Sequence, residues 1–464
     1  SQVVTREVFE TIEWIRPDLL RIFAGNGETM ATVEPSGPAD FKFAQAAERY
    51  LNYVFFEDND GYKFIDAFAF DGLAQKLGVG AVYWEPNEYH GPETLTGLNA
   101  VQVQQLQGDQ SLQMEEPQAT PRPEGQSEAY PDGMEYEVEV RRLSSYGCAK
   151  VINVPPEYFR VGTGVTDLDD CRYCARIVPT TKSELKKAFP EHADDIDDWS
   201  AGDMTLMDDE RRHARFDDQE DFDEHPGDED ILLTEEYIRY DLNGDGLSEM
   251  VAVKRLGDLL LEVEEVDDHP FFDWTPIRVP HRLHGLSIYD IMKDVQRTKT
   301  VLMRAALDAT YQAVAPRVAA NVQNVNMSDL LSVKAGGVIR VRGEPRANMQ
   351  PMAVPDLAPS ALRMMEFVDQ VGEARSGVTR NAQGLDPDSL NKTATGIKLM
   401  QNAASARKEM IARNMAAGLK KGMRKLLRLI AGNQDFQRQI AVAGEIFTVD
   451  PRSWNADMRV VVHP

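Results

Sequence analysis

The sequence predicts an α+β protein with a mixed N-terminal half and a mainly helical second half. Apolar residues three and four positions apart predict helices over 41–58 and 62–77. Strict alternation of apolar and polar residues predicts a strand over 134–145. From residue 287 the pattern changes to long stretches with the period of a helix. The first of them, 287–313, would be about 40 Å long at ~1.5 Å per residue.

The N-terminal half continues with strands separated by Gly- and Pro-rich turns. Residues 78–86 follow a glycine break and predict a strand. Residues 99–133 are rich in Gln, Pro and Gly, and they predict an edge strand followed by a loop. Two more strands are predicted over 150–162, which runs into a Pro–Pro turn, and over 172–180. We therefore expect a sheet-rich region before residue 285.

A short helix over 181–192 leads into a strongly acidic run. Thr181 or Ser183 is the expected N-cap, and Pro190 is expected to end the helix. Residues 191–230 then hold eighteen Asp and Glu against three Arg. Such a run predicts a solvated acidic insertion, with a protein-binding patch as the alternative.

A turn at 241–249 has the opening of a calcium-binding loop. The pattern D-x-[DN]-x-[DN]-G is formed by Asp241, Asn243, Asp245 and Gly246. An EF-hand also needs a helix on each side and a bidentate Glu at loop position twelve, where this chain has Ala252. The flanking residues instead predict strands, so we expect a hairpin turn. Glu249 joins the three oxygen donors as a candidate ligand for Ca²⁺ or Mg²⁺; the alternative is a turn built from residues that tolerate positive φ.

Composition and missing motifs exclude several functions. The net charge of −26 argues against tight wrapping of nucleic acid, because neutralising phosphates needs Lys and Arg. The sequence has no run of about eighteen apolar residues, so no membrane span is expected. Cys171 and Cys174 form a C-x-x-C, but no second pair stands at zinc spacing, and reduced thiols are expected. Phosphate-loop, metalloprotease and nucleophile-elbow motifs are also missing, so no enzyme and no required cofactor are predicted.

The second half has an order that is not typical of a catalytic domain. Helix 287–313 is followed by short strands and turns, a second helix, a polar loop, a very long helix and a short β segment. The long helix contains Gly418 and Gly422, where a bend is expected. Residues 391–431 hold ten Lys and Arg and one Glu, opposite in charge to the acidic run.

At this point the sequence resembles a known family. The stretches "HRLHGLSIYDIMKDVQRTKTVLMRAALDAT" and "GVTRNAQGLDPDSLNKTATGIKLMQNAASARKEMIARNMA" are similar to the portal protein, or head–tail connector, of short-tailed double-stranded DNA bacteriophages. The segments "DLNGDGLSE" and "VPPEYFRV" also resemble this family. The loop and helix at 377–415 are the most specific part.

The resemblance implies a portal subunit in a dodecameric ring at one capsid vertex. The implied parts are a wing (1–285), a stem helix (286–313), a clip (314–357), a second stem helix (358–379), a tunnel loop (380–396), a long wing and crown helix (397–431) and a C-terminal β segment (432–464). The implied function is a channel through which double-stranded DNA is packaged and ejected. The implied location is the virion, after assembly in the host cytoplasm.

The resemblance also implies site residues and partners. The tunnel-loop candidates are Arg380, Asn381, Gln383 and Lys392. In the stem, Lys293 and Arg297 either line the bore or pair with Asp290 and Asp294 of neighbouring subunits. The expected partners are other copies of the chain, the major capsid protein, a scaffold protein, terminase, a tail adaptor and the DNA. A metal-dependent enzyme or a monomeric calcium-binding protein that uses the 241–249 carboxylates is the alternative.

Overall fold

The chain folds into two compact units, each built from separate stretches of sequence. The computed structural model describes residues 2–25, 29–38, 40–107, 112–121, 134–199, 230–314, 317–332, 336–351, 358–378, 394–442 and 445–462. The first unit comprises Ser1–Leu19, Leu73–Lys76 and Leu286–Ile411, and the second comprises Leu20–Gly72, Leu77–Gly285 and Ala412–Pro464. One boundary therefore falls where the helical half begins, although the first nineteen residues belong with that half. Within the described ranges, no helix is long and apolar enough to cross a bilayer.

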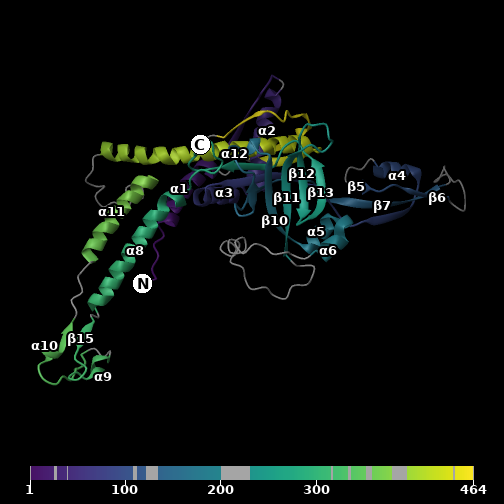
Figure 1. Cartoon of the computed structure of the whole chain (residues 1–464). Helices are drawn as coiled ribbons and strands as arrows, with labels where there is room; N and C mark the ends of the chain where they lie inside the picture. The colour runs from purple at the N-terminus through teal and green to yellow at the C-terminus, as the bar shows by residue number, and fades with distance from the viewer. Residues whose placement is uncertain are drawn as a thin grey trace. The chain divides into compact units, whose positions relative to one another are not determined.

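The first unit is mainly helical. Its long helices are α8 (Ile288–Val314), α11 (Ala358–Ser376), the start of α1 (Glu7–Ala24) and the start of α12 (Ala394–Asn433). Helices α8 and α11 lie side by side as a hairpin (Figure 1). Small elements connect them: β15 (Val318–Ala320), α9 (Met327–Leu330), α10 (Pro345–Asn348) and β16 (Met349–Pro351). Strands β15 and β16 pair antiparallel.

Local chemistry fixes the ends of the hairpin helices. Before α8, the Ser287 Oγ accepts the Asp290 N–H at 3.1 Å, and the Asp290 carboxylate accepts the Ser287 N–H at 3.0 Å. This reciprocal capping box satisfies N–H groups that a helix start leaves unpaired. After α11, Gly377 has φ +76° and donates its N–H to the Glu373 carbonyl at 2.9 Å. A glycine in this conformation is a common helix stop.

The second unit holds the remaining elements. Its helices are α2 (Phe41–Tyr53), the π-helix η1 (Val54–Asp58), α3 (Gly61–Gln75, which ends in the first unit), α4 (Ala100–Gln107), η2 (Leu168–Asp170), α5 (Lys182–Ala188), η3 (Pro190–His192), α6 (Ala193–Asp198), η5 (Pro451–Ser453) and the larger part of α12. Its strands are β1 (Ala31–Glu34), β2 (Gly78–Glu85), β3 (Glu88–Tyr89), β4 (Glu93–Leu98), β5 (Leu112–Met114), β6 (Gln118–Pro121), β7 (Met134–Ser145), β8 (Cys148–Val154), β9 (Phe159–Val161), β10 (Tyr173–Thr181), β11 (Asp230–Tyr240), β12 (Glu249–Leu256), β13 (Leu259–Glu265), β14 (Phe271–Trp274), β17 (Arg438–Val442), β18 (Glu445–Val449) and β19 (Arg459–Val462).

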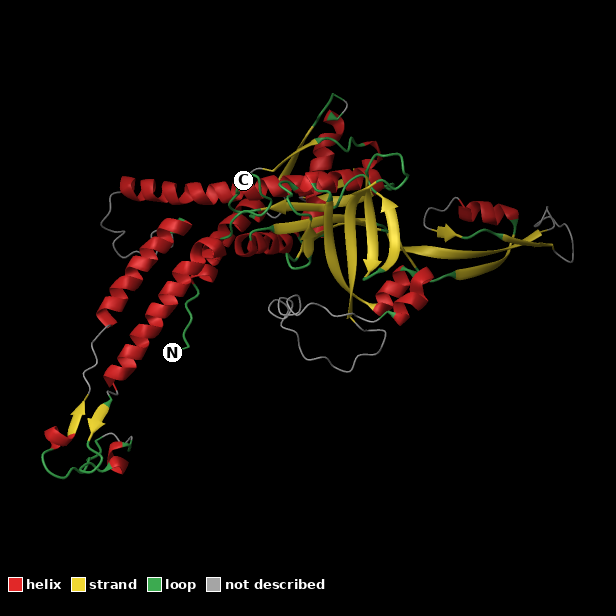
Figure 2. Cartoon of the chain, in the orientation of Figure 1, coloured by secondary structure: helices red, strands yellow, loops and turns green. Residues whose placement is uncertain are grey.

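The strands form antiparallel sheets (Figure 2). One sheet has the order β13-β12-β11-β10-β9, and another has the order β14-β2-β8. The long strand β7 pairs with β3, β4, β5 and β6. Strand β1 pairs with β19, which joins the two ends of the chain's second unit. The fold is thus mixed helix and sheet, as the α+β prediction requires.

Helix α12 packs closely on β14 through two glycines. A Cβ at Gly418 would lie 2.4 Å from the Asp273 carbonyl oxygen, and one at Gly422 would lie 2.7 Å from the Phe272 ring. Only glycine permits so close an approach. The sequence predicts a bend at these positions, which stays a prediction; the structure assigns one helix over them, and the two glycines pack against β14.

Two predictions for 99–133 are wrong. Residues 112–114 and 118–121 form strands β5 and β6, not a loop, and residues 100–107 form helix α4, not an edge strand. Asn99 and Gln102 make a reciprocal cap, because each backbone N–H donates to the other's side-chain oxygen at 2.8 and 2.9 Å. The helix then buries Val103 against Val138 and Val140 of β7. The N-x-x-Q spacing was the helix signal, and it outweighs the apparent alternation of the following residues.

Candidate functional site

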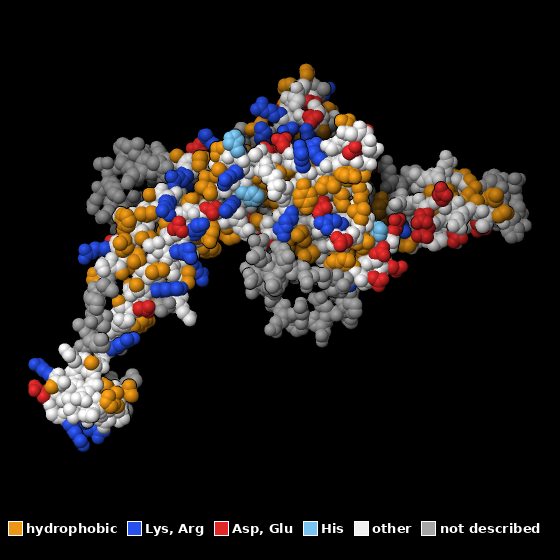
Figure 3. Space-filling view, in the orientation of Figure 1, with side chains coloured by type: hydrophobic (Ala, Val, Ile, Leu, Met, Phe, Trp, Pro, Cys, Tyr) orange, Lys and Arg blue, Asp and Glu red, His pale blue; other side chains and the backbone are white. Residues whose placement is uncertain are grey.

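The α8–α11 hairpin exposes large apolar side chains along both helices. On α8, Val301 is 64% exposed and Tyr311 67%; on α11, Phe367 is 59% exposed. Figure 3 shows hydrophobic side chains lying among Lys and Arg over these helices. The other large apolar side chains exposed on the hairpin are Tyr289, Val314, Leu362 and Met364. Apolar side chains exposed along two paired helices are a candidate surface for association.

Lys299 joins the hairpin to the N-terminal helix. Its Nζ lies 2.6 Å from Glu7 Oε1 of α1 and 2.6 Å from Asp369 Oδ1 of α11. Burial works to lower the pKa of Lys299, but the hydrogen bonds to Asp369 and Glu7 outweigh it and raise the pKa. The lysine therefore stays charged and fixes three helices together. Near it, Thr5 Oγ1 and Thr300 Oγ1 lie 2.9 Å apart.

The stem charges predicted from the sequence fall into two groups. Asp290 is held within its own subunit by the capping box and by Lys76, whose Nζ lies 3.3 Å away. Burial works to raise the pKa of Asp290, but the bonds from Ser287 and Lys76 lower it. Lys293 and Arg297 are exposed on α8, and Lys293 Nζ lies 5.9 Å from the centre of the Tyr289 ring. Their predicted place in a channel stays a prediction.

The tunnel-loop candidates lie outside the described residues. The stretch 379–393, between α11 and α12, contains all four of them: Arg380, Asn381, Gln383 and Lys392. The greater part of the acidic insertion, 200–229, lies outside the described residues as well. The flanking helices are described, and Arg407 of α12 donates to the Ala374 carbonyl at the end of α11, at 3.2 Å.

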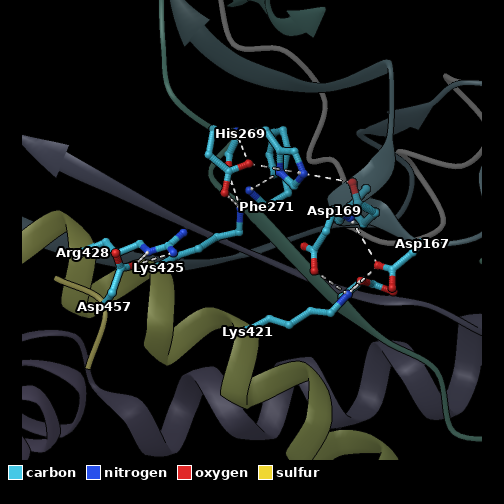
Figure 4. A network of polar contacts seen from close by, with 11 residues as sticks. Asp167, Asp169, His269, Phe271, Lys421, Lys425, Arg428 and Asp457 are labelled. Atoms are coloured by element: carbon cyan, nitrogen blue, oxygen red, sulfur yellow. Dashed lines mark hydrogen bonds and ion pairs between the residues drawn. The ribbon is translucent and has the colours of Figure 1, made fainter. Parts of the chain in front are cut away.

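The basic helix α12 faces acidic side chains of the same chain. In the second unit, Lys421 Nζ lies 2.6 Å from Asp167 Oδ1, 3.2 Å from Asp169 Oδ2 and 3.7 Å from Asp273 Oδ1 (Figure 4). Lys425 pairs with Asp268, and Arg428 binds Asp457 at 2.7 Å. Lys421, Lys425 and Arg428 of the helix thus have carboxylate partners within the second unit. Carboxylates of the second unit therefore face this part of the basic helix.

Asp273 is the most buried carboxylate of this network. Burial raises the pKa of Asp273 above its usual range, although Lys421 opposes the shift. Its Oδ1 makes no hydrogen bond in the described structure. Burial alone would lower the pKa of the Lys421 ammonium, but Asp167, Asp273 and Asp169 together raise it. The network therefore keeps a positive charge on Lys421 and disfavours the ionised form of Asp273.

The calcium-type turn uses its acidic side chains as acceptors for its own backbone. Asp241 accepts the N–H groups of Gly244 and Gly246 at 2.6 and 2.8 Å, and Asp245 accepts that of Leu247 at 2.7 Å. Asn243 Oδ1 accepts the Asp245 N–H at 2.9 Å, and Glu249 lies 3.4 Å from the Asn243 amide. The turn joins β11 to β12, as predicted, so it is not an EF-hand. Ca²⁺ or Mg²⁺ binding there stays a prediction.

Sequence reasoning missed two residues. Lys299 was read only as part of an amphipathic helix, because its acidic partners lie far away in the sequence. His269 lies beside Cys171 and Cys174 in the core, and no spacing rule connects a histidine so distant along the chain. A hydrogen bond from Cys174 is the largest influence that lowers the pKa of Cys171, to about 5, and the same contact and burial raise that of Cys174.

Comparison with protein families settles what kind of protein this is. A family model described as "Phage SU10 portal protein" matches residues 1–464, the whole chain. The chain belongs to this portal protein family. Phage portal proteins are structural components of the virion capsid rather than an enzyme family. The family resemblance predicted from the sequence is confirmed.

Proposed function

We propose that this portal protein assembles into a ring of about twelve subunits, set at one capsid vertex, around a channel for double-stranded DNA. The observation that carries the proposal is the match of the portal family over the whole chain. The DNA enters during packaging and leaves during ejection. Packaging energy comes from a partner terminase, and the ring itself is a conduit.

The exposed hairpin supports assembly from identical subunits. Val301, Tyr311 and Phe367 lie on the surface of a single subunit. Full burial of a large apolar side chain contributes about 1.5–3 kcal/mol. A neighbouring copy that covers these residues gains this energy at every interface of the ring. The hairpin formed by α8 and α11 is therefore the proposed stem.

The charge of the chain suits a channel that DNA slides through. Each subunit has a net charge of −26. Strong cationic rings would hold phosphates tightly, because releasing their counterions is worth orders of magnitude in affinity. The proposed bore carries only a few cations, at Lys293, Arg297 and the loop residues Arg380 and Lys392. Four cations of α12, Lys408, Lys421, Lys425 and Arg428, are paired with Asp side chains of the same chain.

The small elements between the stem helices form the proposed clip, which contacts the tail adaptor and terminase. This segment pairs β15 with β16, and Arg340 holds Asp329 with two bonds of 2.6 and 3.0 Å. Its surface exposes Leu331 (74%) and Val338 (83%). Other partners proposed for the ring are the major capsid protein and the scaffold protein.

Aspartate substitutions on the hairpin test the assembly. Val301→Asp and Phe367→Asp place a charge where a neighbouring subunit is proposed to pack. Sedimentation analysis should show rings for the wild type and smaller species for both variants. Leu247→Asp is the matched control, since Leu247 is as exposed (70%) but lies in the 241–249 turn. Rings of wild-type stability in both hairpin variants would contradict the proposed interface.

A further inference from the structure

Three side chains that bind soft transition metals meet in the core of the second unit. Cys171 lies between η2 and β10, Cys174 lies at the start of β10, and His269 lies just before β14. Their two Sγ atoms and a ring nitrogen all lie within 4.8 Å of one another. The three residues are 0%, 0% and 1% exposed. Among the residues that the structure describes, no other set of three His, Cys, Asp or Glu side chains is gathered in this way.

We propose that Cys171, Cys174 and His269 bind a structural zinc ion, with Asp268 as the fourth ligand. Structural zinc sites are tetrahedral and take Cys and His ligands, with two cysteines commonly supplied by one C-x-x-C. The ion ties the start of β10 to the segment before β14. It therefore connects two sheets of the second unit, which also meet through apolar packing and through Arg176 over the Tyr83 ring.

Asp268 and Lys425 balance the charge of the site. Asp268 Oδ1 lies 3.9 Å from His269 Nε2 but outside the group of ligand atoms within 4.8 Å, so its side chain must turn toward the thiols to complete the site. Two thiolates, one carboxylate and Zn²⁺ sum to one negative charge. Lys425 offsets it, because its ammonium pairs with the Asp268 carboxylate and lies 2.7 Å from the His269 carbonyl oxygen (Figure 4). A neutral set of charges is what a buried site requires.

The backbone already orients the histidine. Its Nε2 lies 2.9 Å from the Leu168 carbonyl oxygen, and its Nδ1 accepts the Phe271 N–H at 3.2 Å. Metal binding at Nδ1 replaces the contact with the Phe271 N–H. The Nε2–H then donates to the Leu168 carbonyl and holds the ring in place, as backbone groups do for most metal-bound histidines.

The alternative is a pair of reduced thiols that fill the core. Cys171 and Cys174 pack in a hydrophobic cluster with Leu168, Phe271 and Leu283. Buried cysteines often serve as small apolar side chains. That role does not explain why a fully buried imidazole with a neighbouring carboxylate and ammonium sits against both thiols, which is why we favour the metal.

Metal analysis of the full chain distinguishes these two roles. After extensive dialysis, elemental analysis should find about one zinc ion per subunit. Adding cobalt(II) to chelator-treated protein should give thiolate charge-transfer bands and the visible bands of a tetrahedral site. This titration needs no substitution, so a folding defect cannot confuse it. Folded wild-type protein that binds neither zinc nor cobalt would overturn the proposal.

Variants then assign the ligands. Cys174→Ser should lose the bound metal, whereas Cys148→Ser should keep it, because Cys148 lies outside the group. Asp268→Asn should keep a cobalt spectrum with both thiolates but weaken the affinity about tenfold or more, as loss of a ligand or its support does. Equal metal loss in Cys174→Ser and Cys148→Ser would overturn the thiolate assignment. Unchanged affinity in Asp268→Asn would overturn the fourth ligand.

Discussion

Replacing Gly418 by alanine tests the close contact between α12 and β14. In a helix interior, Gly→Ala gains about 1 kcal/mol from backbone propensity. At Gly418 the new Cβ would lie 2.4 Å from the Asp273 carbonyl oxygen and 2.7 Å from the Trp274 Cβ. Overpacking typically costs about 1–3 kcal/mol, and the upper end applies here because a backbone atom cannot rotate away. We expect a net loss of about 2 kcal/mol in the free energy of unfolding.

Gly432→Ala is the matched control on the same helix. No heavy atom lies within 4 Å of a Cβ at Gly432, so only the propensity gain remains. This variant should be more stable than the wild type by about 0.4–1 kcal/mol. Urea unfolding of both variants, followed by tryptophan fluorescence at one protein concentration, gives the comparison. If Gly418→Ala were stabilised as much as Gly432→Ala, the packing of α12 on β14 would be wrong.

Three further predictions address charge, capping and the channel. Asp273→Asn should stabilise the protein at neutral pH, because burial raises the pKa of Asp273 in the folded state. The gain in stability should vanish below about pH 4, where the carboxyl is protonated in both the folded and the unfolded protein. A gain that persists below that pH would contradict this prediction. Ser287→Ala removes the cap of α8 and should cost about 1 kcal/mol in denaturant unfolding, whereas an unchanged midpoint would show that the cap is not needed. The double variant Arg380→Ala, Lys392→Ala should form normal rings but impair DNA packaging or retention; loss of ring assembly would instead place these residues at a subunit contact.

Patterns that are local in the sequence predicted the fold well. The period of 287–313 predicted α8 within a residue at each end. Thr181 caps α5 with Glu184, as one of the two caps considered. Alternation predicted β7 over its full length. Each of these depends on neighbours along the chain, so the sequence holds the information.

Long-range contacts could not be predicted in this way. Lys299 lies between Glu7 and Asp369, neither of which is near it in the sequence. His269 reaches Cys171 only because β14 and β10 fold against the same core. The sequence suggested a bend at the glycines of α12. The strand that packs on them could not be foreseen. Pairing of this kind is decided by tertiary packing.

The mass and symmetry of the assembled particle test the central claim most directly. Native mass spectrometry of the purified chain should give one dominant species at about twelve times the 52.0-kDa subunit mass. Electron microscopy of the same sample should show closed rings with an axial opening. A monomer at every concentration, with no ring in the images, would contradict the account.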